Sequence, residues 1–286
     1  MQKILILGAT GMIGQTLFRC LATESTADVY GTVRSAEARH FFAPALASKL
    51  IADVDASHLA RVDEVIATLR PDVVINAIGL VKQLEAAHDP VLAITFNSLL
   101  PHQLAALCKA HAARFIQIST DCVFSGTRGD YRESDAPDAT DLYGRSKVLG
   151  EVVNVPHAIT LRTSTVGHEL KGGHGLVGWF LAQQGSVKGY RKAIYSGLPT
   201  VELARVIRDF VLPRPELHGL YHVAGNPIDK YSLLTLVAQA YGVTTGIIPD
   251  DAFHIDRSLN AERFHAATGY RPPAWPELVR RMEAFR

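Results

Sequence analysis

Short apolar runs alternate with longer amphipathic segments between residues 3 and 161. The short runs are rich in β-branched residues and bounded by turn residues, which is typical of buried strands, whereas the longer segments repeat apolar residues with helical spacing. The predicted strands are 3–7, 28–33, 47–51, 73–77, 114–119 and 158–161, and the main helices between them are 14–22, 58–70, 99–112 and 143–152. This alternation predicts an α/β fold with a Rossmann-type doubly wound parallel sheet, whose ligands bind at the carboxyl ends of the strands.

The alternation breaks after Thr165, where a glycine-rich stretch covers residues 167–175. Further on, we predict a helix at 199–212, a strand at 219–223, a helix at 230–241 and a loop with a short strand at 249–257. The chain therefore divides into residues 1–165, which form the sheet domain, and residues 166–286, a smaller C-terminal α/β region. Residues 201–223 are expected to pack back on the sheet.

Composition narrows the class of partner. Hydrophobic residues make up 48% of the 286 positions, which allows a large core, and 29 basic residues balance 28 acidic ones without a long run of either sign. This balance predicts neither a nucleic-acid nor a membrane partner. The three cysteines lie far apart and, like the histidines, show no metal-binding spacing, so we expect no metal site and a reducing, cytoplasmic setting.

A glycine-rich turn follows the first predicted strand and opens the first helix. Its three glycines have the spacing G-x-x-G-x-x-G, which permits a tight turn and close approach of a pyrophosphate to the helix N-terminus. The same pattern could form a turn without a ligand, but its position after the first strand favours a dinucleotide. The residues assigned to this contact are Gly8, Thr10, Gly11, Met12, Ile13 and Gly14.

Three later strand ends complete the predicted cofactor site. Arg34 and Ser35 stand where an NAD enzyme usually carries an acid, and a guanidinium suits the 2′-phosphate of NADPH, although Arg34 could also be a solvated surface residue. Asp53 and Val54 are expected beside the adenine. The fourth strand is followed by Ala77, Ile78 and Gly79, a stretch with small residues that would let a ribose lie close.

A tyrosine and a lysine four positions apart mark the predicted catalytic site. Tyr143 and Lys147 share one helix face, downstream of a strand that ends in Ser119 and Thr120. Reduction of a carbonyl by hydride needs a proton for the alkoxide, and a nearby ammonium should lower the phenol pKa while also holding the nicotinamide ribose. Thr120 can donate to the same oxygen. Alone, Y-x-x-x-K is often a solvated helix face, so the combination with the dinucleotide turn carries the prediction.

At these residues the chain resembles the extended short-chain dehydrogenases/reductases, and more narrowly the dTDP-4-dehydrorhamnose reductase family. The resemblance covers nearly the whole chain and is densest between residues 114 and 165, in the stretches 118–126, 131–137, 143–151 and 161–164. It implies NADPH-dependent reduction of the 4-keto group of a nucleotide-linked 6-deoxyhexulose. It also implies that Thr120, Tyr143 and Lys147 are catalytic and that residues 166–286 mainly bind substrate.

The substrate site is predicted from position and chemistry. Arg257, in a stretch that resembles the family's C-terminal motif, is expected to hold the diphosphate, with Arg191 of the basic and aromatic stretch 188–192 as a second candidate that could equally be solvated. Lys82, Asp121 and Thr165 are expected to line the pocket. Thr165 stands where the family often has tryptophan, and Cys122 replaces an aromatic residue, so a UDP-linked N-acetylated 4-keto-6-deoxyhexose competes with the dTDP sugar.

Two other classes of function compete with a reductase. An epimerase or dehydratase of the same superfamily would retain NAD, but no Asp-Glu pair follows Thr120, which argues against a typical dehydratase. A non-catalytic subunit that binds NADP, as in the regulatory subunit of methionine adenosyltransferase, would resemble the same family; the intact catalytic residues argue against it. A homodimer is a possible assembly.

Overall fold

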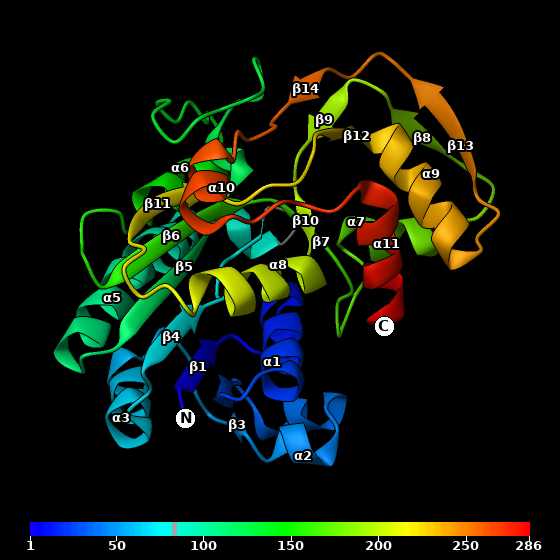
Figure 1. Ribbon diagram of the computed structural model, residues 1–286. Helices are drawn as coiled ribbons and strands as arrows, with labels where there is room; N and C mark the ends of the chain where they lie inside the picture. Colours follow the sequence, from blue (N-terminus) through cyan, green and yellow to red (C-terminus); the bar gives the residue numbers. More distant parts are fainter. Residues whose placement is uncertain (82–84) are drawn as a thin grey trace.

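A parallel sheet of seven strands forms the centre of the molecule (Figure 1). The computed structural model describes residues 1–81 and 85–286. The strand order is β11-β6-β5-β4-β1-β2-β3, and every neighbouring pair is parallel. This order confirms the predicted doubly wound α/β fold. The strands are β1 (Lys3–Leu7), β2 (Asp28–Thr32), β3 (Leu50–Ile51), β4 (Val73–Asn76), β5 (Arg114–Thr120), β6 (Ala158–Thr163) and β11 (Gly219–His222).

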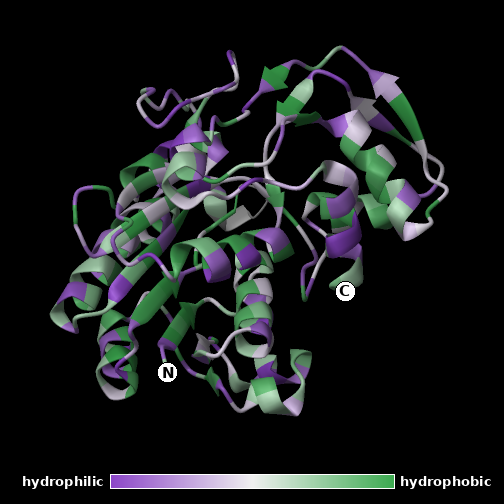
Figure 2. Ribbon diagram, viewed as in Figure 1, coloured by the Kyte–Doolittle hydropathy of each residue, from purple (hydrophilic) through white to green (hydrophobic). Residues whose placement is uncertain are grey.

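Strand β1 shows why these runs are apolar throughout. Ile4 and Ile6 belong to a hydrophobic core on one face of the sheet, whereas Leu5 and Leu7 belong to a second core on the other face. The first core also contains side chains of α1 (Met12–Glu24) and α8 (Thr200–Val206), and the second contains side chains of α3 (Leu59–Leu69) and α5 (Leu100–Ala110). Figure 2 shows the hydrophobic strands between these helices.

Two predicted boundaries were wrong for local reasons. The strand expected at 47–51 is reduced to Leu50–Ile51, because Pro44 starts a short helix, α2 (Pro44–Ala47), that takes up Ala47. The helix expected at 99–112 begins earlier: the Asp89 carboxylate accepts from the amides of Val91 and Leu92 and starts a continuous helical segment. Its parts are α4 (Pro90–Ala93), the π-helical turn η3 (Ile94–Leu99) and α5.

The segment Pro90–Ala110 is long and apolar enough to cross a membrane by length and composition alone. In this fold, Leu100 and Leu104 are buried in a core that they share with β5, and Asn97 and Ser98 bond to α6 (Leu142–Leu149). These contacts describe a helix packed against the sheet. Helix α6 ends at Leu149, three residues before its predicted end, and is followed by Gly150, where a Cβ would lie 1.9 Å from the Asn97 carbonyl oxygen.

The C-terminal region builds small sheets beside the carboxyl ends of the central strands (Figure 1). β9 pairs with β12 and β14, β8 with β13, and β7 with β10. Helix α9 covers the predicted range, and the predicted helix 199–212 is present as α8 followed by the π-helical turn η5 (Ile207–Val211). The strands here are β7 (Thr165–Val166), β8 (Ser186–Tyr190), β9 (Ala193–Tyr195), β10 (Leu198–Pro199), β12 (Ile228–Asp229), β13 (Gly246–Asp250) and β14 (Ile255–Asp256).

Strand β11 returns the chain to the central sheet, where it pairs with β6. The division of the chain near residue 165 stays a prediction. The remaining elements are the 3₁₀ turns η1 (Ala36–Phe41), η2 (Glu85–His88) and η4 (Asp121–Val123), and the helices α7 (Leu176–Leu181), α9 (Lys230–Tyr241), α10 (Glu262–Thr268) and α11 (Trp275–Ala284).

Candidate active site

The turn between β1 and α1 is built so that only glycine fits. Gly8 has φ +82°, and a Cβ on Gly14 would lie 2.1 Å from the Gly8 carbonyl oxygen. Gly11 is the N-cap of α1, and no side chain of the described residues caps this helix end. The first backbone N–H groups of the helix therefore remain available, which is the arrangement that binds a phosphate group. Thr10 is exposed beside them, and Met12 and Ile13 are half-buried.

The other predicted cofactor residues follow β2, β3 and β4, so they lie at the same edge of the sheet as the turn. Arg34 and Ser35 are exposed, and the Ser35 hydroxyl accepts from the Glu37 amide 3.2 Å away. Asp53 has φ +59° and is exposed, whereas Val54 is buried and bonds to the Val33 carbonyl. The exposed Arg34 guanidinium is therefore accessible to a ligand that binds at this edge from solvent.

The end of β4 connects this edge to the predicted catalytic residues. The amide of Ala77 donates to Leu7, and the amide of Ile78 donates to the Asn76 side chain at 3.1 Å. A Cβ on Gly79 would lie 3.8 Å from the Lys147 ammonium nitrogen. Gly79, one of the residues predicted beside the ribose, therefore lies next to the lysine predicted to hold it.

Thr120, Tyr143 and Lys147 come together where β5 ends against α6. The Thr120 hydroxyl donates to Asp121 at 3.1 Å and accepts from the Cys122 amide at 3.1 Å, and it lies beside the Tyr143 phenol. Lys147 is buried and donates to the Ile118 carbonyl at 2.9 Å. A hydroxyl, a phenol and an ammonium thus lie at one strand end, between the glycine turn and the C-terminal region.

The expected lowering of the phenol pKa was wrong for the protein by itself. Burial raises the pKa of Tyr143 above its ordinary value, and the neighbouring Thr120 hydroxyl opposes this effect only in part. Burial also lowers the pKa of Lys147 to about 8, with Glu151 acting against it. The physical reason is that desolvation disfavours both charged forms while Lys147 is bonded to a backbone carbonyl. Tyr143 is accordingly a neutral phenol that carries its proton.

A cavity of about 420 Å³ begins beside these residues and extends into the C-terminal region. Asp121, Thr165 and Arg257, three of the residues expected to bind substrate, are among those that line it. Burial raises the pKa of Asp121, and the nearby Arg257 opposes that rise. The further lining residues are Cys122, Ser164, Val166, His174, Leu176, Trp179, Ala193, Ile194, Tyr195, Lys230, Leu233 and Ile255.

One predicted substrate residue, Arg191, is placed differently. Arg191 is exposed and forms a two-point ion pair with Asp251, and it is not one of the described residues that line the cavity. The prediction failed to anticipate this pairing because Asp251 lies sixty positions away, in the segment that follows β13. Lys82 lies outside the described residues.

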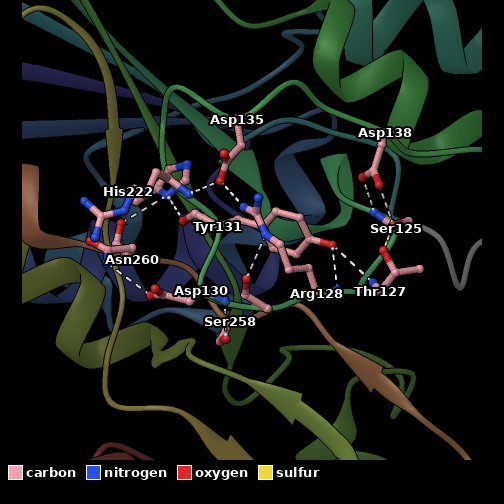
Figure 3. Close-up of polar contacts among 12 residues, drawn as sticks. Ser125, Thr127, Arg128, Asp130, Tyr131, Asp135, Asp138, His222, Ser258 and Asn260 are labelled. Atoms are coloured by element: carbon pink, nitrogen blue, oxygen red, sulfur yellow. Dashed lines mark hydrogen bonds and ion pairs between the residues drawn. The ribbon is translucent and has the colours of Figure 1, made fainter.

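Arg257 is held in place by the loop between β5 and α6. Its Nε donates to the Phe124 carbonyl at 2.9 Å and its Nη1 lies 3.6 Å from the Cys122 sulfur. Figure 3 shows how the neighbouring segment is fastened: the Asp130 amide donates to the Ser258 hydroxyl, and the Asn260 side chain donates to Asp130 at 3.1 Å. These bonds join the loop between β5 and α6 to the segment that carries Arg257.

His222 supports the same loop from β11. Its Nδ1 lies 3.0 Å from the Tyr131 carbonyl and 3.2 Å from the Asn260 carbonyl (Figure 3). Burial, together with the positive charge of Arg162, lowers the pKa of His222 to about 4. The imidazole is therefore neutral at pH 7 and acts as a donor between two backbone segments.

Sequence reasoning missed several cavity residues, chiefly Trp179, Tyr195 and Lys230. They come from α7, β9 and the start of α9, and no short motif contains them. The Tyr195 hydroxyl is buried without a hydrogen-bond partner in the described structure, and burial raises its pKa well above the ordinary value. The pairing of β9 with β12 brings Tyr195 close to the start of α9, which directly follows β12.

Comparison with known proteins finds two kinds of relative. The dTDP-4-dehydrorhamnose reductase of Salmonella typhimurium is 29% identical over 305 aligned positions, which cover 98% of this chain and 96% of that protein. Subunit beta of methionine adenosyltransferase 2 from Danio rerio is 28% identical over 262 positions, covering 87% and 77% of the two chains.

Solved structures agree on the fold. The crystal structure of dTDP-4-dehydrorhamnose reductase from Bacillus anthracis in complex with NADP superposes with a TM-score of 0.80 at 22% identity, and covers 100% of this chain and 99% of that one. The family model described as the RmlD substrate binding domain matches residues 1–282. The chain therefore belongs to the RmlD substrate binding domain family.

Proposed function

We propose that this protein reduces the 4-keto group of a nucleotide-linked 6-deoxyhexulose with NADPH, in the biosynthesis of deoxysugar precursors. The observation that carries the proposal is the placement of Thr120, Tyr143 and Lys147 between the glycine turn and the cavity. A ligand in the cavity and a dinucleotide on the turn would meet at these three side chains. The full-length match to a reductase supports the same reaction.

The described residues fit NADPH at the edge of the sheet. The uncapped N-terminus of α1 and the crowded glycines 8 and 14 suit a pyrophosphate, and the exposed Arg34 suits a 2′-phosphate. Gly79 and Lys147 suit the nicotinamide ribose. When bound there, NADPH supplies the hydride for carbonyl reduction.

Side chains of the protein supply the proton that the reduced carbonyl oxygen requires. Tyr143, with its raised pKa, holds a proton at neutral pH and donates it to the oxygen that receives negative charge. Thr120 stabilises the same oxygen through its hydroxyl, which lies beside the phenol. Lys147 places a positive charge close to the site, because at pH 7 it lies below its pKa of about 8.

The sugar and nucleotide occupy the cavity in this proposal. Asp121 and Thr165 lie at the catalytic end, where the hexulose would be, and Arg257 offers a guanidinium to the diphosphate. Both a dTDP-linked 6-deoxyhexulose and a UDP-linked N-acetylated one carry a diphosphate and a 4-keto sugar. We place the reaction in the cytoplasm, where NADPH and nucleotide sugars are made and where free cysteines such as Cys20 and Cys108 stay reduced.

A substrate panel tests the reaction. Purified protein is mixed with NADPH and with dTDP- and UDP-linked 4-keto-6-deoxyhexoses, and the loss of NADPH absorbance is followed together with the sugar product. We expect turnover of at least one sugar and none with the 4-hydroxy sugars as controls. NADPH binding without reduction of any sugar in the panel would contradict the proposal.

That negative outcome would favour a second candidate, a regulatory subunit that binds NADP. The similarity to subunit beta of methionine adenosyltransferase 2 is the specific observation behind it. Copurification with a methionine adenosyltransferase catalytic chain, measured with and without NADP, distinguishes the two functions.

A further inference from the structure

Lys230 enters the cavity from the start of α9 and is held there by aromatic rings. Its ammonium nitrogen lies 5.3 Å from the centre of the Trp179 ring and 5.5 Å from that of Tyr190. Contacts of this kind attract a cation and fix its position, but they do not neutralise its charge. Lys230 and Trp179 both line the cavity. The Lys230 side chain is therefore a cation of fixed position on the part of the cavity wall that the C-terminal region forms.

The carboxylates nearest to Lys230 in sequence and in the adjoining strands are already engaged. Asp229 caps α9, since it accepts from the Ser232 amide at 2.8 Å and from the Ser232 hydroxyl at 2.6 Å. Asp250 pairs with Lys188 at 2.9 Å, and Asp251 pairs with Arg191. Within residues 1–81 and 85–286, Lys230 forms no ion pair. It differs in this respect from Lys188 and Arg191, whose charges are balanced by these two carboxylates.

Lys230 carries its charge at an electrostatic cost. A lysine in the first turn faces the positive end of the helix dipole, where an acidic residue would be favourable. Burial also lowers its pKa from the ordinary value, with no opposing contribution. An anion in the cavity would offset both effects. Arg257, across the same cavity, is a second cation, but it already donates to the Phe124 carbonyl.

We propose that Lys230, held between Trp179 and Tyr190, binds the diphosphate of the nucleotide-sugar substrate. The inference rests on the proposed function for the identity of the ligand, and it assigns the main ionic contact to a residue outside every recognised motif. Three N–H donors on one ammonium can meet the phosphate oxygens, while Arg257, directly after β14, contributes a directional contact. Within the stretch 188–192, Tyr190 is then the residue that supports Lys230.

The test compares Lys230→Met with Lys188→Met. Both changes remove one lysine charge and keep the aliphatic length, but Lys188 is exposed on β8 and paired with Asp250. Binding of dTDP, UDP, thymidine and uridine is measured by titration calorimetry in the NADP-loaded protein. For Lys230→Met we expect about 10–100-fold weaker binding of whichever diphosphate the protein takes, because a charge-assisted contact is lost. Nucleoside and NADPH affinities should not change, and Lys188→Met should match the wild type.

Lys230→Arg keeps the positive charge but changes the shape of the side chain. It should recover most of the diphosphate affinity that Lys230→Met loses. Equal binding of dTDP and UDP by Lys230→Met and wild type would overturn the assignment. Loss of NADPH or nucleoside binding in the same variant would also overturn it, because the residue would then support the fold. If the protein reduces no sugar yet binds a diphosphate through Lys230, the reductase proposal fails while the anion site stands.

Discussion

The cofactor edge and the substrate cavity of this protein are built in different ways. The edge consists of short turns, each directly after a parallel strand, and its key features are backbone ones: the φ of Gly8 and the uncapped start of α1. The cavity consists of side chains from six separate segments, from Asp121 to Arg257. The difference teaches that dinucleotide binding here depends on local chain geometry, whereas substrate choice depends on which side chains the C-terminal region delivers.

Tyr143 lies where the two regions meet, so its replacement should have the largest effect. Tyr143→Phe removes only the proton donor, and we expect turnover to fall about 10²–10⁴-fold, the usual contribution of one positioned acid. Single-turnover rates and NADPH affinity are measured together, and the affinity should be unchanged. Tyr241→Phe is the matched control, because it removes another half-buried hydroxyl, one that bonds to His168 at 2.8 Å. Full activity of Tyr143→Phe on a verified 4-keto sugar would remove Tyr143 from the mechanism.

Arg34 tests the cofactor edge alone. Arg34→Ala should weaken NADPH about 10–100-fold and leave NADH affinity nearly unchanged, because only the 2′-phosphate contact is lost. Fluorescence titration with both nucleotides gives the ratio, and the KM of the nucleotide sugar should not move. If the wild type bound NADPH and NADH equally, the basis for the assigned contact would be gone.

Arg257 tests the cavity alone. Arg257→Gln keeps a donor for the Phe124 carbonyl but removes the charge, and we expect the KM of the nucleotide sugar to rise about tenfold with NADPH affinity unchanged. Steady-state kinetics at saturating NADPH measures the effect. A change in NADPH affinity of similar size would contradict the separation of the two regions.

His222 should have the smallest effect on the reaction and a distinct effect on stability. Its pKa is about 4 in the folded chain and near 6.5 when unfolded, so the unfolded state binds the proton more readily, and stability is lost as pH falls from 6.5 to 4. Over that range the contribution is at most about 3 kcal/mol. Urea unfolding at several pH values should show the advantage of wild type over His222→Gln shrinking as the pH falls. A constant difference would mean that His222 is not buried as a neutral donor.

Much of the fold was determined by the sequence itself. Apolar runs long enough for one strand each, separated by helical periodicity, determine a parallel sheet because both faces must be covered. The glycine turn could also be predicted from the sequence, because the backbone conformation at Gly8 and the close packing at Gly14 both require glycine. The spacing of Tyr143 and Lys147 placed both on one helix face, since four residues nearly complete a turn.

Tertiary structure alone decided charge and solvation. Arg191 and Lys230 look alike in sequence, yet the first is neutralised by Asp251 and the second lies unpaired, among the described residues, against Trp179 and within the cavity. The direction of the Tyr143 pKa likewise followed from burial. Ion pairing and desolvation depend on segments that meet only after folding, so their effects on a side chain cannot be read from its neighbours along the chain.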